Sequence, residues 1–146
     1  MPLPAEIQLP FDWCRTVTPG PVIVTARPAG WAGAFTPVIT VTRSGPSSGA
    51  GHPARRAGPP PLGDSLAALG GHIVHLSAGV TPQVHLDVTL AVELHGLDLT
   101  ITQRHLLGAD GEAIVATGMA ADDDWADVAP VLMTAVRSLR SPRTGP

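Results

Sequence analysis

The clearest pattern in the sequence is a strict alternation of residue types over residues 84–95. Every second position carries Val or Leu, and most of the positions between them are polar. A period of two over this length predicts a β-strand with one buried face. His95 and Gly96 form a predicted tight turn, and a second strand is expected over 97–104.

A two-residue turn at His95 and Gly96 fixes which residues of this hairpin lie opposite each other. The apolar residues of both strands then share one face. Asp87 lies opposite Arg104, which is a favourable cross-strand pair. The other expected pairs are Leu94 with Leu97, Val92 with Leu99, Leu90 with Ile101, and Glu93 with Asp98, the last unfavourable but at a solvated hairpin end.

Three more strands are predicted from β-branched runs. Residues 22–27 and 37–43 are rich in Val, Ile and Thr and are bordered by prolines. Asp110-Gly111 is a favoured hairpin turn, so residues 112–120 are expected to return as the next strand. The resulting meander is antiparallel because tight turns connect its strands.

Two helices are expected beside the sheet. Asp64 or Ser65 can cap the first, and Leu66, Leu69, Ile73 and Leu76 have helical spacing, although Gly70-Gly71 favours a kink or an early stop. The second follows the carboxylates of residues 122–124, which are expected to cap it and to favour its dipole. It should begin near Asp127, because Pro130 is tolerated in a first turn, and end near Leu139.

The order of elements predicts one α+β domain over residues 1–146, an antiparallel meander with helices packed on its apolar face. The stretch before residue 11 reads as an extended arm because of its prolines. Residues 44–63 are rich in Gly, Pro and Ser and are expected to form a flexible loop, and residues 141–146 a tail.

Composition narrows the possible functions. The net charge is −3 and all nine basic residues are Arg, without a basic stripe, which argues against nucleic-acid binding. No stretch approaches the roughly 20 apolar residues of a membrane-spanning helix, and the start resembles no secretory signal, so a cytoplasmic location is expected. The single cysteine, Cys14, is expected to be a small buried residue beside Trp13.

No known catalytic, cofactor or metal motif stands out. Four histidines recur every ten residues, but strand and helix geometry does not bring three or four of them to one point, as zinc requires. His72 and His75 share a face of the first predicted helix without an obvious Ser partner. The sequence therefore predicts no catalytic residue, no cofactor site and no metal site. The histidines of the ten-residue series are His75, His85, His95 and His105.

The candidate binding surface is the Thr-rich face of the meander, which also carries apolar residues. Such a mixed face can be open to water, covered by a helix of the same chain, or occupied by another chain. Two aromatic residues before the second strand can line a groove or pack at the sheet end. The candidate residues are Trp31, Phe35, Asp87, Thr89, Thr100, Thr102, Arg104 and Thr117.

Four segments of the chain have the layout of a known superfamily: Phe11-Asp12-Trp13, residues 35–42, Gln103-Arg104, and Trp125 with residues 136–140. Through them the chain resembles, over residues 7–140, the Mog1/PsbP-like superfamily, including LpqN-like and DcrB-like domains, some of which resemble Eag-type chaperones of secreted effectors. The resemblance implies an α/β/α sandwich and a mainly non-enzymatic role, with no catalytic motif to transfer.

These observations predict a non-enzymatic binding or assembly module, with a protein partner or a second copy as a homodimer, and with a link to secretion as a chaperone or adaptor. The alternative is a small-molecule or lipid carrier with an aliphatic pocket between sheet and helices. A His-dependent metal protein is the third hypothesis.

Overall fold

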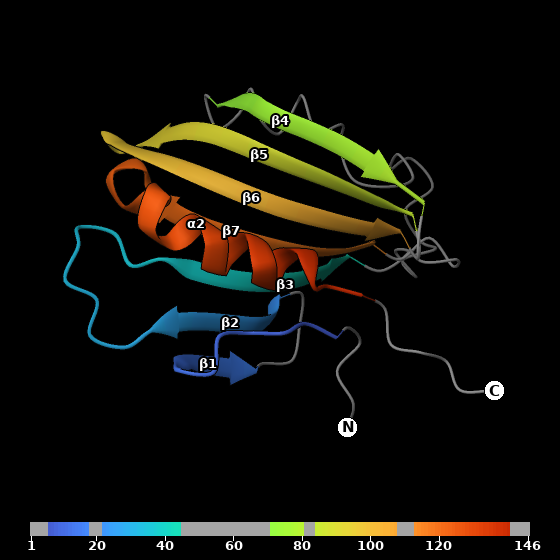
Figure 1. Ribbon diagram of the computed structural model, residues 1–146, viewed down its shortest axis with the longest axis horizontal. Coiled ribbons are helices and arrows are strands. Elements are labelled where there is room, and N and C mark those ends of the chain that lie inside the picture. Colours follow the sequence, from blue (N-terminus) through green and yellow to red (C-terminus); the bar gives the residue numbers. More distant parts are fainter. Residues whose placement is uncertain (1–5, 18–21, 45–70, 81–83, 108–112, 141–146) are drawn as a thin grey trace, which may run out of the picture.

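A computed structural model describes residues 6–17, 22–44, 71–80, 84–107 and 113–140. These residues form one seven-stranded antiparallel sheet and one helix (Figure 1). The elements are β1 (Trp13–Val17), β2 (Val22–Pro28), β3 (Val38–Ser44), β4 (His72–Gly79), β5 (His85–Leu94), β6 (Leu97–Leu107), β7 (Ala113–Ala121) and α2 (Asp122–Arg137).

The strands lie in the order β1-β2-β3-β7-β6-β5-β4. Every neighbouring pair is antiparallel, and the pairing of β3 with β7 joins the two halves of the sheet. The predicted α+β class with an antiparallel meander is therefore confirmed. Apart from Ser44, which ends β3, the predicted loop over 44–63 lies outside the described residues, as does the tail.

The hairpin of β5 and β6 has the predicted register. Leu94 pairs with Leu97, Leu90 with Ile101, and Asp87 with Arg104. His95 and Gly96 both have positive φ, 53° and 79°, as a type I′ turn requires. The alternating pattern was sufficient here because a shift by one residue would expose every buried side chain of the strand.

The register between β6 and β7 differs from the prediction by one residue. A two-residue turn at Asp110-Gly111 would place Leu107 opposite Ile114, but Leu107 pairs with Ala113. The turn itself lies outside the described residues. Because side chains alternate along a strand, this shift moves Thr117 to the opposite face from the one predicted.

β4 corrects a second prediction. Ile73 and Leu76 belong to this strand and not to a helix. A register shift between Ile73 and His75 places His72 opposite Ala91 and His75 opposite Thr89, so the two histidines share a strand face. Leu66 and Leu69, the other residues of the predicted stripe, lie outside the described residues. Spacing alone misleads here because β4 is an edge strand without a buried face, so its apolar residues do not alternate strictly.

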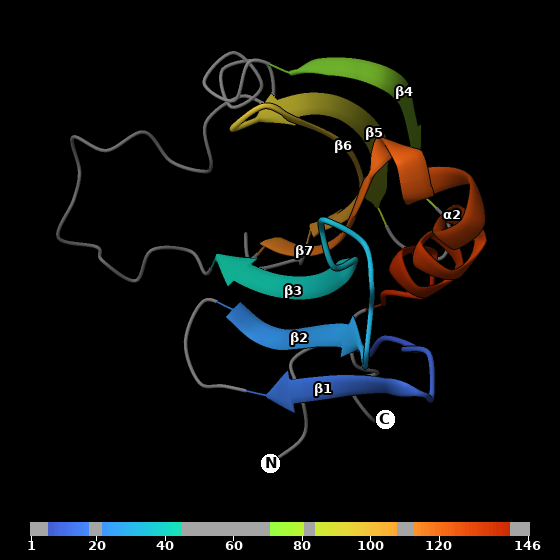
Figure 2. The same cartoon turned by 90° about the vertical axis from the view of Figure 1, so that its left-hand side faces the viewer.

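Helix α2 lies along one side of the sheet, as Figure 2 shows, and contacts mainly β7 and β6. Gly118 allows this close approach, since a Cβ there would lie 3.2 Å from side-chain atoms of both Leu132 and Val136. Gly118 pairs with Thr102, so the helix covers the Thr102 side, here called the helix face. The prediction that helices cover the Leu90 and Ile101 side is thus wrong for α2.

Apolar clusters occupy both faces of the sheet. On the helix face, small and aliphatic residues of four strands meet the buried residues of α2. On the opposite side, here called the far face, a second cluster follows the alternating residues of β5 and β6. The helix-face cluster includes Val24, Ala26, Ile39, Val41, Leu106, Ala116, Ala120, Val128, Leu132 and Val136, and the far-face cluster Val88, Leu90, Val92, Leu99, Ile101 and Ala121.

Two further expectations are wrong, one about the start of α2 and one about the burial of Cys14. The helix begins at Asp122, not near Asp127, so Pro130 lies inside it, and its N-cap Ala121 provides no side-chain hydrogen bond. The carboxylates of residues 122–124 instead lie in the first turn, where they favour the dipole. Cys14 is exposed because it belongs to the edge strand β1, which the sequence did not predict.

Candidate functional site

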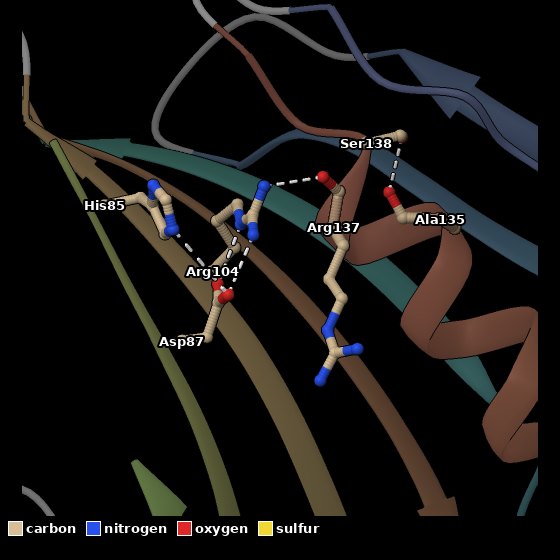
Figure 3. Close-up of polar contacts among 6 residues, drawn as sticks. All are labelled: His85, Asp87, Arg104, Ala135, Arg137 and Ser138. Carbon is tan, nitrogen blue, oxygen red and sulfur yellow. Dashed lines mark hydrogen bonds and ion pairs between the residues drawn. The ribbon is translucent and has the colours of Figure 1, made fainter. Parts of the chain in front are cut away.

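The most organised polar cluster lies where β5, β6 and the end of α2 meet (Figure 3). The Arg104 guanidinium donates through Nε to Asp87 Oδ1 and through Nη2 to Asp87 Oδ2, each at 2.7 Å. The two side chains are only 15% and 14% exposed. This two-point geometry is the strongest form of an ion pair between side chains.

Arg104 also fixes the helix. Its Nη1 donates to the Arg137 carbonyl oxygen at 2.6 Å, which satisfies one of the acceptors left free at a helix C-terminus. The next residue, Ser138, donates its hydroxyl to the Ala135 carbonyl and accepts from the Gln8 backbone N–H. The cluster thus joins the sheet, the helix end and the N-terminal segment.

The charges around Asp87 determine its ionisation. Burial raises the pKa of Asp87, but the hydrogen bond and charge of Arg104, together with the charges of His85 and Arg137, outweigh it and lower the pKa below its ordinary value of 3.8. His85 Nε2 lies 4.0 Å from Asp87 Oδ2. Asp87 is therefore a permanent anion near neutral pH, suited to holding structure and poorly suited to proton transfer.

The threonines of β5 and β6 lie on the helix face together with Asp87 and Arg104. Thr89 and Thr102 are buried, and Thr100 donates its hydroxyl to Asp122 Oδ1 at 2.5 Å. A Cβ on Gly118 would contact both Thr102 and α2, so Thr102 lies beside the helix. Of the three possible states of this face, a helix of the same chain covers the part formed by β6 and β7.

Thr117 lies apart from these residues, on the far face. It accepts a hydrogen bond from Gln103 Nε2 at 3.2 Å, and Gln103 Oε1 lies 3.0 Å from His105 Nε2. Burial lowers the pKa of His105, while the charge of Asp87 partly opposes this shift.

A row of directly opposed polar residues crosses the far face. Thr16 pairs with Thr25, Thr25 with Thr40, Thr40 with Thr117, and Thr117 with Gln103. All are at least partly exposed. This threonine row could not be predicted without the β3–β7 pairing. The signal visible in the sequence is that Thr40 and Thr42 stand at alternate positions of a predicted strand.

Trp31 and Phe35 do not line one groove. Trp31 packs against the helix-face cluster and Phe35 against the far-face cluster. The segment that bears them therefore wraps around the end of the sheet. The Trp31 indole nitrogen is buried and has no hydrogen-bond acceptor among the described residues.

The described part of the chain provides no support for a metal site or for a membrane-spanning helix. No three His, Cys, Asp or Glu side chains in it gather closely enough to hold a metal ion. None of its helices has the length and hydropathy needed to cross a membrane.

A shallow groove runs between α2 and the N-terminal segment. Its volume is about 450 Å³. It lies outside the helix, and not between sheet and helix where the carrier hypothesis placed a pocket. Its lining residues are Gln8, Leu9, Pro10, Pro130, Val131, Thr134 and Ala135.

Comparison with solved structures identifies the fold as Mog1/PsbP-like. The cyanobacterial PsbP protein CyanoP of Synechocystis is similar with a TM-score of 0.62 and 15% identity, over 95% of this chain and 87% of that one. LpqN of Mycobacterium tuberculosis, which is involved in cell envelope biogenesis, is similar with a TM-score of 0.61 and 13% identity, over 94% of this chain and 83% of that one. A protein of unknown function from Pseudomonas aeruginosa is similar with a TM-score of 0.55 and 11% identity, over 97% of this chain and 99% of that one.

No protein-family model and no curated protein sequence matches the chain. At these identities the likeness defines the fold and assigns no activity.

Proposed function

We propose that this chain is a non-catalytic binding or assembly module that contacts a protein partner through the threonine row of its far face. One observation carries the proposal: the charged cluster of the helix face is engaged within the chain. Arg104 donates to both Asp87 and the Arg137 carbonyl, and Thr100 donates to Asp122. The threonine row is neutral and at least partly exposed, and within the described part of the chain Thr117 is its one threonine whose hydroxyl is engaged by another side chain, that of Gln103.

One fold neighbour supports a role in assembly, since LpqN is involved in cell envelope biogenesis. We extend this to a chaperone or adaptor linked to protein export, working as a homodimer in the cytoplasm, where it would receive its partner before export.

The test compares proteins recovered with the tagged chain from its native host by chemical crosslinking and quantitative mass spectrometry. Thr40→Arg and Thr16→Arg place a long charged side chain on the threonine row, and Ala126→Arg on the exposed side of α2 is the matched control. A partner should be enriched with wild type and with the control and lost with both threonine variants. Equal recovery by all four chains would refute the proposal. Thr16 is exposed on an edge strand, so its variant should fold even if the Thr40 variant does not.

The alternative, a small-molecule carrier, is favoured by the groove beside α2, because about 450 Å³ falls within the range of roughly 300–1,000 Å³ of ligand pockets. Native mass spectrometry of gently purified protein should then show a bound molecule that Val131→Arg removes. A bare polypeptide mass for both proteins would count against this function.

A further inference from the structure

The two edges of the sheet differ in chemistry. The outer edge of β4 pairs with no other strand in the described residues. Of the eight residues of β4, seven are exposed, and Ile73, Val74 and Leu76 are 40%, 61% and 51% exposed. An apolar edge of this length leaves a row of backbone N–H and C=O groups available to another strand.

Proteins normally protect such edges with charged residues, with proline or with short strands. The opposite edge strand, β1, has only five residues and carries Arg15 at its centre. β4 contains no Asp, Glu, Lys, Arg or Pro, and its one irregularity is a shift of register between Ile73 and His75. The β1 edge is therefore protected by charge, whereas the β4 edge is suited to accept a partner strand.

We propose that β4 pairs antiparallel with β4 of a second copy, which extends the sheet across a two-fold axis at Leu76. This inference deepens the homodimer part of the proposed function and uses a different surface from the threonine row. In this register Leu76 lies opposite its own copy and His75 opposite Ser77 of the second copy. Both pairings keep each residue on its face, because Leu76 shares the face of Val88, while His75 and Ser77 share that of Thr89 and Asp87.

Charge favours a second copy as the occupant. In a two-fold antiparallel pair, a charged residue at the axis would lie opposite its own copy, and one beside the axis would lie close to it, which destabilises the pair. β4 has none. The nearest carboxylate on the neighbouring strand, Asp87, is compensated by Arg104.

The area indicates a reversible dimer. Eight residues at about 3.3 Å each and a sheet thickness of roughly 10 Å give about 260 Å² for each copy. The two copies together therefore bury about 520 Å², well below the roughly 1,200 Å² of total buried area in stable complexes. The expected dissociation constant is therefore micromolar or weaker, and the dimer should appear only as concentration rises.

Sedimentation velocity from about 1 to 300 μM, a range chosen to bracket weak affinities, tests the proposal. Wild type should shift from monomer to dimer. Leu76→Lys and Leu76→Glu should each remain monomeric, because the introduced charge lies opposite itself on the axis, and an equimolar mixture of the two should dimerise again. Val17→Lys, a matched change of an exposed apolar residue on the β1 edge, should behave like wild type.

Wild type that remains monomeric at every concentration would overturn the proposal. So would Leu76→Lys dimerising like wild type, or loss of the dimer in Val17→Lys. Rescue in the mixture excludes simple unfolding as the cause of monomer. Failure here is distinguishable from failure of the partner hypothesis, because Leu76→Lys leaves the threonine row unchanged and Thr40→Arg leaves β4 unchanged.

Discussion

Replacing Arg104 by Met should test whether the charged cluster holds the helix to the sheet. The change removes two hydrogen bonds to Asp87 and one to the Arg137 carbonyl, and it leaves a carboxylate that is 14% exposed without its main partner. In its burial the pair is intermediate between two classes. Exposed ion pairs contribute about 0 to 1 kcal/mol to stability, and breaking a fully buried pair costs about 3 to 5 kcal/mol. We expect a loss of about 2 to 3 kcal/mol in the free energy of unfolding, out of the roughly 5 to 15 kcal/mol of a typical domain.

Urea unfolding followed by the fluorescence of the three tryptophans measures this loss. Arg27→Met, a change of an exposed arginine on β2, is the matched control and should be nearly neutral. The double variant Asp87→Leu, Arg104→Met should recover part of the stability, since it leaves no unpaired charge. A single variant within about 0.5 kcal/mol of wild type would refute the reasoning, and so would strictly additive losses in the double variant.

Acid should weaken the same cluster. The pKa of Asp87 is lower in the folded chain than its ordinary value of 3.8, so the unfolded chain binds the proton first. The stabilisation is fully present above about pH 4 and is lost as the pH falls through the lower folded value. Arg104→Met should therefore reduce the dependence of stability on pH below about pH 4, measured by urea unfolding at several pH values.

Three further substitutions test other features of the fold. Gly118→Val should destabilise the protein by about 1 to 3 kcal/mol in urea unfolding, because its side chain would meet Leu132, whose Cβ is already 3.2 Å from an added Cβ. His95→Asn should raise the melting temperature by a few degrees, since Asn adopts positive φ more readily than His in this turn. His105→Gln should flatten the fall in stability from about pH 7 to 5, because burial lowers the pKa of His105 and the unfolded chain therefore protonates first. An unchanged slope would contradict the last expectation.

The sequence predicted the parts of the fold that local pattern determines. The register of β5 and β6, with Asp87 opposite Arg104, follows from alternation and a two-residue turn. The same logic failed at β6 and β7, because a turn dipeptide alone does not specify loop length, and one residue of difference placed Thr117 on the other face. The consequence was a candidate surface that combined residues from both sides of the sheet.

Longer-range features were beyond prediction for a physical reason. Which face α2 covers depends on where small residues gather across several strands. Gly118 belongs to β7, which lies between β3 and β6, so its role in admitting the helix can be inferred only when the strand order is known. The edge position of β4 likewise depends on strand order, and its apolar residues fit a helical stripe as well as a strand. For Trp31 and Phe35 the sequence left a shared groove and packing at the sheet end as alternatives, and the two residues pack against different clusters.

The pairing of β3 with β7 has a consequence for how the chain folds. β1 to β3 and β4 to β7 each consist of strands that pair with their neighbours in sequence, whereas Thr40 and Thr117 must meet across a long intervening chain. Closing such a loop costs entropy before any contact repays it, so this central junction should be the slow, rate-determining event. Two pre-formed half-sheets would then search for each other, and the helix, which contacts β6, β7 and β3, would lock the junction once it forms.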